Sequence, residues 1–133
     1  MHGYVINKDI GLLVIKYAGE TTIEELAELI ATIIKDPDYS RSLNVLSDMR
    51  ELNSSYSYQQ MQAVVDKFPD PGEMVGKTRS AVLVAKDLTY GMGRVWGSIT
   101  ENRTVAQAQV FRGLEEALEW LGLHEDAEIE FPF

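Results

Sequence analysis

The chain has 133 residues, of which 45% are hydrophobic and 25% charged, an ordinary length and composition for one globular domain. The absence of cysteine excludes disulfides, thiolate metal sites and cysteine nucleophiles. The only histidines, His2 and His124, stand near the ends of the sequence, which argues against a histidine-rich zinc centre. The formal net charge of −9, from 21 acidic and 12 basic residues, disfavours nucleic acids and anionic membrane surfaces as partners.

Targeting and membrane signals are missing from the sequence. The first residues lack the basic segment and apolar stretch of a signal peptide, and no apolar run approaches the roughly 20 residues that cross a bilayer. We therefore expect a cytoplasmic protein without an integral membrane segment. No linker or internal repeat divides residues 1–133, so they are expected to form a single domain.

An antiparallel hairpin is expected at the start of the chain. Residues 4–6 and 12–17 are rich in strand formers, and residues 7–9 between them have the composition of a turn. We interpret Gly11 as the position of a β-bulge beside this turn.

Helices and strands are expected to alternate after the hairpin. The first helix has the clearest start, because Thr21 and Thr22 each stand three residues before a glutamate, as in a capping box. It should end before Pro37. The remaining elements are expected as strands at 43–49, 80–85 and 105–111 and as helices at 58–68, 88–100 and 114–121, with Pro69 and Pro71 closing the second helix and Gly122 capping the last.

This β-β-α-β-α-β-α-β-α order predicts an α/β fold with a mostly parallel five-stranded sheet and an antiparallel N-terminal hairpin. In residues 105–111, small apolar residues alternate with glutamines, which indicates a less covered face or a strand at the edge of the sheet.

Several of these features recur in a known family. They are the opening hairpin, a capped helix, a strand ending in Asp48-Met49-Arg50 and a short apolar strand; the most specific is a close with Val110-Phe111-Arg112 followed by Leu114, Glu116, Ala117, Trp120 and Leu121. In them the chain resembles the SpoIIAA-like proteins, a STAS-like α/β group related in fold to anti-sigma-factor antagonists and CRAL-TRIO lipid-binding domains. The resemblance implies the fold. The antagonists carry a phosphorylatable serine in an Asp-Ser-Ser/Ala-Gly-type turn, whereas residues 51–58 of this chain contain no glycine.

Charged and aromatic residues follow the predicted strands, at the sheet edge where open α/β proteins bind ligands. Together they either bind a small polar or anionic ligand or pair with one another and cap helices, which is the commoner arrangement. These residues are Asp48, Arg50, Lys86, Asp87, Tyr90 and Arg112.

The loop with Ser54, Ser55 and Ser57 has two interpretations. Ser55 or Ser57 at a helix N-terminus could carry a phosphate stabilised by backbone N–H groups, or serve simply as an N-cap. The glycines at 91, 93 and 97 lie too far beyond a strand for a dinucleotide loop, so we expect close helix packing at Gly93 and Gly97, or a hinge at Gly91, and no cofactor.

Aromatic and methionine residues of the second and third helices also have two interpretations. They form core, or they border an apolar groove for a lipid-like ligand or a dimer partner. The residues concerned are Tyr56, Tyr58, Met61, Phe68, Tyr90, Met92 and Trp96.

The sequence thus predicts a non-enzymatic regulatory or binding domain that engages a protein partner or a small lipophilic ligand, as a homodimer, without a metal or catalytic residues. The ligand-binding residues would be Asp48, Arg50, Lys86, Tyr90 and Trp96. The alternative is a switch phosphorylated at Ser55 or Ser57, or a small enzyme that uses the Asp/Arg/Lys cluster.

Overall fold

The computed structural model describes residues 1–67, 78–103, 107–124 and 126–133. The strands are β1 (His2–Asn7), β2 (Leu12–Gly19), β3 (Asn44–Leu52), β4 (Arg79–Leu83) and β5 (Gln107–Phe111). The helices are α1 (Ile23–Lys35), α2 (Tyr58–Val65), α3 (Asp87–Arg103) and α4 (Leu114–Trp120), and a 3₁₀ turn, Lys8–Ile10, joins β1 to β2. This is the predicted order of elements.

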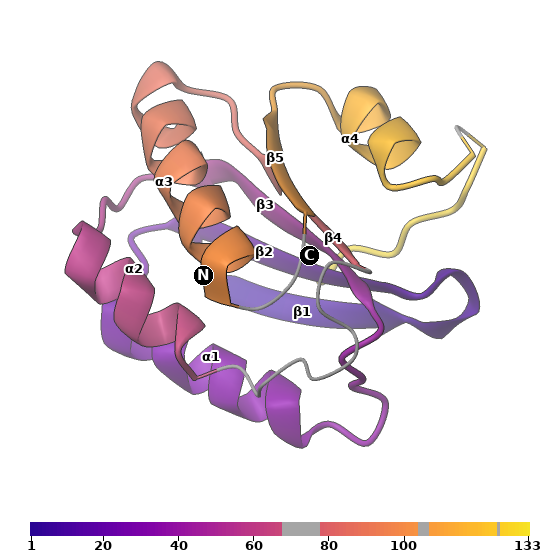
Figure 1. Ribbon diagram of the computed structural model, residues 1–133, viewed down its shortest axis with the longest axis horizontal. Coiled ribbons are helices and arrows are strands. Elements are labelled where there is room, and N and C mark those ends of the chain that lie inside the picture. Colours follow the sequence, from indigo (N-terminus) through magenta and orange to yellow (C-terminus); the bar gives the residue numbers. More distant parts are fainter. Residues whose placement is uncertain (68–77, 104–106, 125) are drawn as a thin grey trace.

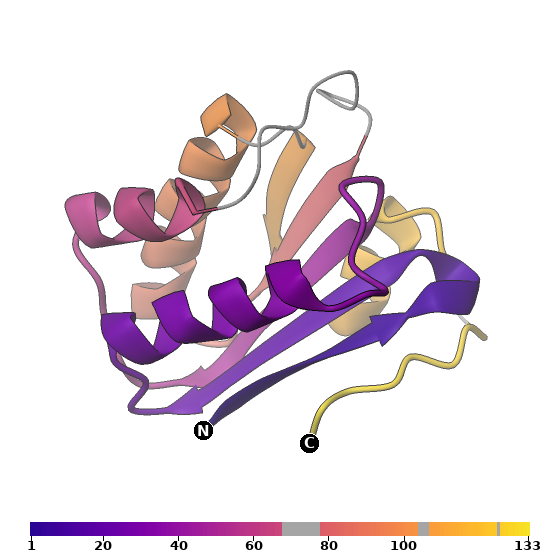
Figure 2. The same cartoon turned by 90° about the horizontal axis from the view of Figure 1, so that it is seen from below.

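All five strands belong to one sheet in the order β1-β2-β3-β4-β5. β1 pairs with β2 antiparallel, and every other pair is parallel, as predicted. Parallel strands that step in one direction and are joined by right-handed crossovers have all their connecting helices on the same face. Accordingly α1, α2 and α3 cover one face of the sheet, while α4 and residues 126–133 lie on the other (Figures 1 and 2).

The core therefore has two parts, one on each face of the sheet. Leu13, Ile15 and Tyr17 of β2 point toward α1–α3, and Leu12 and Val14 point toward α4; all are buried. A strand covered on both faces needs a continuous apolar run rather than an alternating one, which is how this segment reads. The prediction of an edge strand at the end of the chain is confirmed by the position of β5.

The ends of several elements follow their local signals. The Thr22 hydroxyl accepts a hydrogen bond of 3.1 Å from the backbone N–H of Glu25, so Thr22 is the N-cap of α1. Gly122 follows α4 with a φ of 80°, the left-handed conformation expected of a C-terminal cap.

Gly11 is not the site of a bulge. With a φ of 61° it ends the 3₁₀ turn in the left-handed region, and the register irregularity lies instead between Lys16 and Ala18, where β2 pairs with β3. A turn that must reverse the chain sharply uses the positive φ of glycine, which explains the glycine without a bulge.

The third strand of the sheet is longer than predicted. It continues to Leu52, so Asp48 and Arg50 lie within β3 rather than beyond its end. The predicted closing residues of the second helix, Phe68, Pro69 and Pro71, and the start of the last strand at 105 and 106 lie outside the described residues. Among the described residues, no helix combines the length and apolar character that crossing a bilayer requires.

Candidate functional site

A groove of about 420 Å³ runs between α2 and α3 on the helix-rich face. No charged side chain lines it among the described residues. Its walls come from the loop before α2, from α2 itself and from the first half of α3: Ser54, Ser55, Tyr56, Tyr58, Met61, Thr89, Gly91, Met92 and Val95.

Residues 53–56 are held in place by the end of β2 and by Thr21, which lies between β2 and α1. The Ser54 hydroxyl accepts a hydrogen bond of 2.9 Å from the backbone N–H of Thr21, and the Tyr56 hydroxyl donates to the Thr21 carbonyl oxygen. The backbone N–H of Asn53 donates to the Gly19 carbonyl oxygen at 2.9 Å. Burial raises the pKa of Tyr56, so its hydroxyl stays protonated as this donor. This end of the groove is therefore pre-formed.

The two serines proposed for phosphorylation differ in their surroundings. Ser57 caps α2 in a reciprocal box: its hydroxyl accepts from the Gln60 backbone N–H at 3.1 Å, and its own N–H donates to Gln60 Oε1 at 2.9 Å. Ser55 is exposed, and its hydroxyl has no hydrogen-bond partner in the described part of the chain. Ser57 is thus a helix cap, and Ser55 is the accessible hydroxyl at the groove.

The aromatic residues divide between core and groove. Trp96 is 4% exposed and belongs to the core, as does Met61. Tyr58 is 58% exposed and Val95 36% exposed, and both border the groove. The structure thus places Trp96 in the core and Tyr58 at the groove, and Met61 contributes to both.

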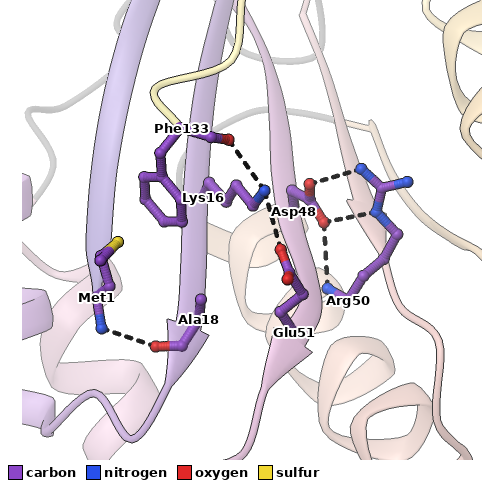
Figure 3. A network of polar contacts seen from close by, with 7 residues as sticks. All are labelled: Met1, Lys16, Ala18, Asp48, Arg50, Glu51 and Phe133. Carbon is purple, nitrogen blue, oxygen red and sulfur yellow. Dashed lines mark hydrogen bonds and ion pairs between the residues drawn. The ribbon is translucent and has the colours of Figure 1, made fainter.

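Asp48 and Arg50 face the opposite side of the sheet, next to Lys16 of β2 (Figure 3). Asp48 is 1% exposed, and its Oδ1 and Oδ2 accept hydrogen bonds of 2.9 and 2.8 Å from Nε and Nη2 of Arg50. The hydrogen bonds to Asp48 raise the pKa of Arg50 further above its ordinary value. Lys16 Nζ lies 2.9 Å from Oε2 of Glu51. These contacts make a fixed network of two ion pairs.

The other predicted site residues form separate pairs at the carboxyl edge of the sheet. Lys86 Nζ donates to Asn53 Oδ1 at 2.6 Å. Nη2 of Arg112 bonds Asp87 Oδ1 at 2.7 Å, and its guanidinium lies 4.7 Å from the centre of the Tyr90 ring. The structure does not bring the five predicted ligand-binding residues together: Asp48 and Arg50 lie on one face, Trp96 is in the core of the other, and Lys86 and Tyr90 lie near the edge.

Sequence reasoning missed Lys16 and Val95. Lys16 had a usable signal, since it is the one charged residue in the apolar run 12–17, and a lysine placed there needs a partner. Val95 had none, because a valine in the apolar pattern of the third helix is typical of a core residue, whereas the structure leaves it at the groove.

A second hollow, of about 510 Å³, lies against α4 and is lined by Glu115, Glu116, Glu119, Gly122, Leu123 and His124. Its acidic side chains do not form a metal-binding group, and within the described residues no cluster of at least three histidine or carboxylate side chains is placed to hold a metal ion. This hollow offers an acidic surface without a defined binding geometry.

No protein-family model matches this sequence, and no curated protein is significantly similar to it. The structure is similar to the crystal structure of an uncharacterized protein from the DUF3478 family, with a SpoIIAA-like fold, from Shewanella loihica PV-4. The TM-score is 0.57 with 22% sequence identity, and the match covers 91% of this chain and 95% of that chain. At this identity the similarity concerns the fold. The chain therefore has a SpoIIAA-like α/β fold, in agreement with the resemblance seen in its sequence.

Proposed function

We propose that the protein is a non-enzymatic binding domain and that the groove between α2 and α3 takes a small lipophilic ligand. The observation that carries this proposal is the groove itself. Its volume of about 420 Å³ falls within the roughly 300–1,000 Å³ typical of ligand pockets. Met61, Met92 and Val95 supply apolar walls.

The polar groups of the groove indicate a neutral ligand. The hydroxyls of Ser54 and Tyr56 are already bonded to the backbone of Thr21. The Thr89 hydroxyl donates to the Lys86 carbonyl oxygen at 3.0 Å. Among the described residues of the lining, Ser55 and Tyr58 keep hydroxyls without a hydrogen-bond partner, and no cation is present for a carboxylate or phosphate. A mainly hydrocarbon molecule with one polar end fits this arrangement.

A small ligand suits the groove better than a protein partner or a second copy. The exposed large apolar side chains at the groove are Tyr58 and Val95. A fully buried aromatic side chain contributes about 150–250 Å². These two side chains therefore fall well short of the roughly 800 Å² per partner in a stable protein interface.

The proposal can be tested with a neutral apolar fluorophore, N-phenyl-1-naphthylamine, titrated into the full chain. We expect saturable binding that weakens at least tenfold in Val95→Glu, because a bound apolar ligand would cover the carboxylate and remove its water at a large desolvation cost. Native mass spectrometry of the untreated purified protein should show a co-purified neutral molecule in the wild type.

Ser98→Glu is the matched control, since Ser98 is exposed on α3, does not line the groove, and gains the same charge. It should bind the fluorophore as the wild type does. Equal binding by the wild type and Val95→Glu would contradict the proposal.

A phosphorylation-controlled switch remains a second candidate, favoured by the free and exposed Ser55 hydroxyl beside the groove. A phosphate there would bring a charge of about −1.5 to −2 to an apolar site and exclude a neutral ligand. Ser55→Glu should then lower fluorophore binding while Ser55→Ala leaves it unchanged. If both variants bound the fluorophore as the wild type does, phosphorylation of Ser55 would not control ligand binding.

A further inference from the structure

Residues 128–133 lie across the face of the sheet opposite the groove, without forming a helix or a strand (Figure 2). The segment reads Glu-Ile-Glu-Phe-Pro-Phe. Because it makes no repeating backbone ladder with the sheet, its position depends on individual contacts with side chains of β1, β2 and β3.

The main chain of the segment is held by Asn7, at the end of β1. Asn7 Nδ2 donates to the Glu130 carbonyl oxygen at 3.2 Å, and the Glu130 N–H donates to Asn7 Oδ1 at 3.0 Å. A side-chain amide can thus satisfy both main-chain groups of one residue, as a neighbouring strand would in peptide recognition.

The side chains of the segment meet matched groups on the sheet. The Phe131 ring centre lies 6.0 Å from the Arg50 guanidinium, and the Phe133 ring centre lies 4.8 Å from Lys16 Nζ. Lys16 Nζ also donates to the main-chain oxygen of Phe133 at 3.0 Å (Figure 3). Each aromatic ring therefore faces one cation, a favourable electrostatic contact.

Gly3 leaves room for the proline between the two rings. A Cβ placed on Gly3 would lie 3.1 Å from Pro132 Cβ, closer than side chains normally pack. The cations are themselves fixed in place, Arg50 by the buried carboxylate of Asp48 and Lys16 by Glu51. The surface is thus complementary to an extended segment in which two phenylalanines flank a proline.

We propose that the surface formed by Gly3, Asn7, Lys16 and Arg50 is a recognition site for an extended Phe-Pro-Phe peptide of a partner protein, occupied in cis by residues 128–133. Proline restricts an unbound peptide to extended conformations, which lowers the entropy lost on binding. The attached segment competes with the partner at an effective concentration in the millimolar range. A partner peptide must therefore bind tightly enough, or be concentrated enough, to displace it. A second copy is a poorer donor, because two chains of net charge −9 repel each other.

The test uses the full chain with Phe131→Ala and Phe133→Ala, which weakens the hold of the attached segment and leaves the sheet surface intact. The synthetic hexapeptide of residues 128–133 is titrated while ¹⁵N-HSQC spectra are recorded. We expect the double variant to bind the peptide at least tenfold more tightly than the wild type, with shifts at Gly3, Asn7 and Lys16. A peptide with both phenylalanines replaced by alanine should not bind. Adding Gly3→Val should abolish binding, because its side chain meets Pro132.

Several outcomes would overturn the proposal. One is that the double variant has a native-like spectrum but does not bind the peptide. Another is that the wild type binds the peptide as tightly as the double variant. A third is that the chemical-shift changes are confined to α2 and α3. If the wild type formed a dimer in sedimentation analysis that the double variant lost, the occupant would be a second copy rather than a partner. Should the double variant fail to fold, Phe133→Ala alone replaces it, since that ring is 43% exposed.

Discussion

At the residue scale, two glycines of α3 that lie two positions apart have opposite surroundings. A Cβ on Gly93 would lie 3.2 Å from Val82 Cγ1 and 3.3 Å from Val84 Cγ1, whereas a Cβ on Gly91 meets nothing within 4 Å. Gly93 therefore lets α3 pack closely on the sheet, as the sequence predicted. Gly91 carries only the entropic cost of glycine in a helix.

We expect Gly91→Ala to stabilise the protein by up to about 1 kcal/mol, through helix propensity alone. Gly93→Ala should destabilise it by about 1–3 kcal/mol, because the packed side chains of Val82 and Val84 would have to shift to make room for the new methyl group. Urea unfolding followed by circular dichroism measures both. A Gly93→Ala variant as stable as Gly91→Ala would show that α3 does not pack as described.

Ser55 and Ser57 form a second matched pair. Ser57→Ala removes the N-cap of α2 and should cost about 1 kcal/mol of stability, whereas Ser55→Ala, which loses no hydrogen bond to a described residue, should cost almost nothing. Thermal unfolding of the two variants decides this. Equal losses would mean that Ser57 is not the cap.

At the scale of elements, one hydrogen bond ties the first strand to the end of the first helix. The Tyr4 hydroxyl donates to Asp36 Oδ2 at 2.6 Å. This bond, with partial burial, raises the pKa of Tyr4 from 10.0 to about 12. The same bond holds the pKa of Asp36 below its ordinary value of 3.8, helped by the backbone N–H of Asp38. Stability should therefore depend on pH at both ends of the scale.

We expect the advantage of the wild type over Tyr4→Phe to shrink as pH rises from 10 to 12. Across this window the unfolded chain loses the phenol proton while the native state keeps it, which favours unfolding. The advantage should also shrink in acid, as pH falls through the lowered pKa of Asp36. Burial raises the pKa of Tyr17 too, but Tyr17 is present in both proteins and cancels. Urea midpoints in a pH series provide the measurement, and a constant difference would contradict the assignment.

The Asp48–Arg50 pair gives a prediction for β3. Arg50→Ala leaves a carboxylate that is 1% exposed without its bidentate partner, so we expect a loss of about 3 kcal/mol. Asp48→Leu combined with Arg50→Met should recover most of that loss, since no buried charge remains. Chemical denaturation of the two variants tests this. If the double variant were no more stable than Arg50→Ala, the loss would not come from an unpaired buried charge alone. The ion pair itself would then stabilise β3.

At the scale of the whole molecule, the direction of the strands separates two surfaces. The right-handed crossovers place α1–α3 and the groove on one face, and the free end after β5 supplies α4 and residues 128–133 to the other. In the described strands no side chain belongs to both surfaces, because successive residues of a strand point to opposite faces of the sheet.

The two surfaces should therefore act independently. We expect Val95→Glu to leave hexapeptide binding to the Phe131→Ala, Phe133→Ala protein unchanged, and the phenylalanine replacements to leave fluorophore binding unchanged. Effects at distant sites without shared partners add. Titration of each probe into the combined variant measures the coupling between the two sites. A change of more than threefold in either affinity would show that a substitution at one site affects binding at the other through the sheet.

Much of the fold follows from short-range signals. The cap at Thr22, the apolar stripe after it and the glycine at 122 each act within a few residues, so periodicity and cap chemistry were enough to place α1 and the end of α4. The apolar run of β2 is typical of a strand covered on both faces, although the hairpin signal alone did not predict that cover. The length of β3 was underestimated because its second half is polar, and those residues remain in the strand through pairing with β2 and through the buried ion pair.

The sequence by itself therefore determined the class of fold, the order of its elements, and the absence of cysteine chemistry. Only the tertiary structure decided which residues meet. Lys16 bonds Phe133 across 117 positions and Asn7 bonds Glu130 across 123, and no local pattern encodes such contacts. For the same reason the predicted site of Asp48, Arg50, Lys86, Tyr90 and Trp96 is distributed over both faces and the edge of the sheet. The sequence indicates which residues lie near the ends of strands. The face of the sheet on which each side chain lies depends on the alternation along the strand and on how whole elements pack.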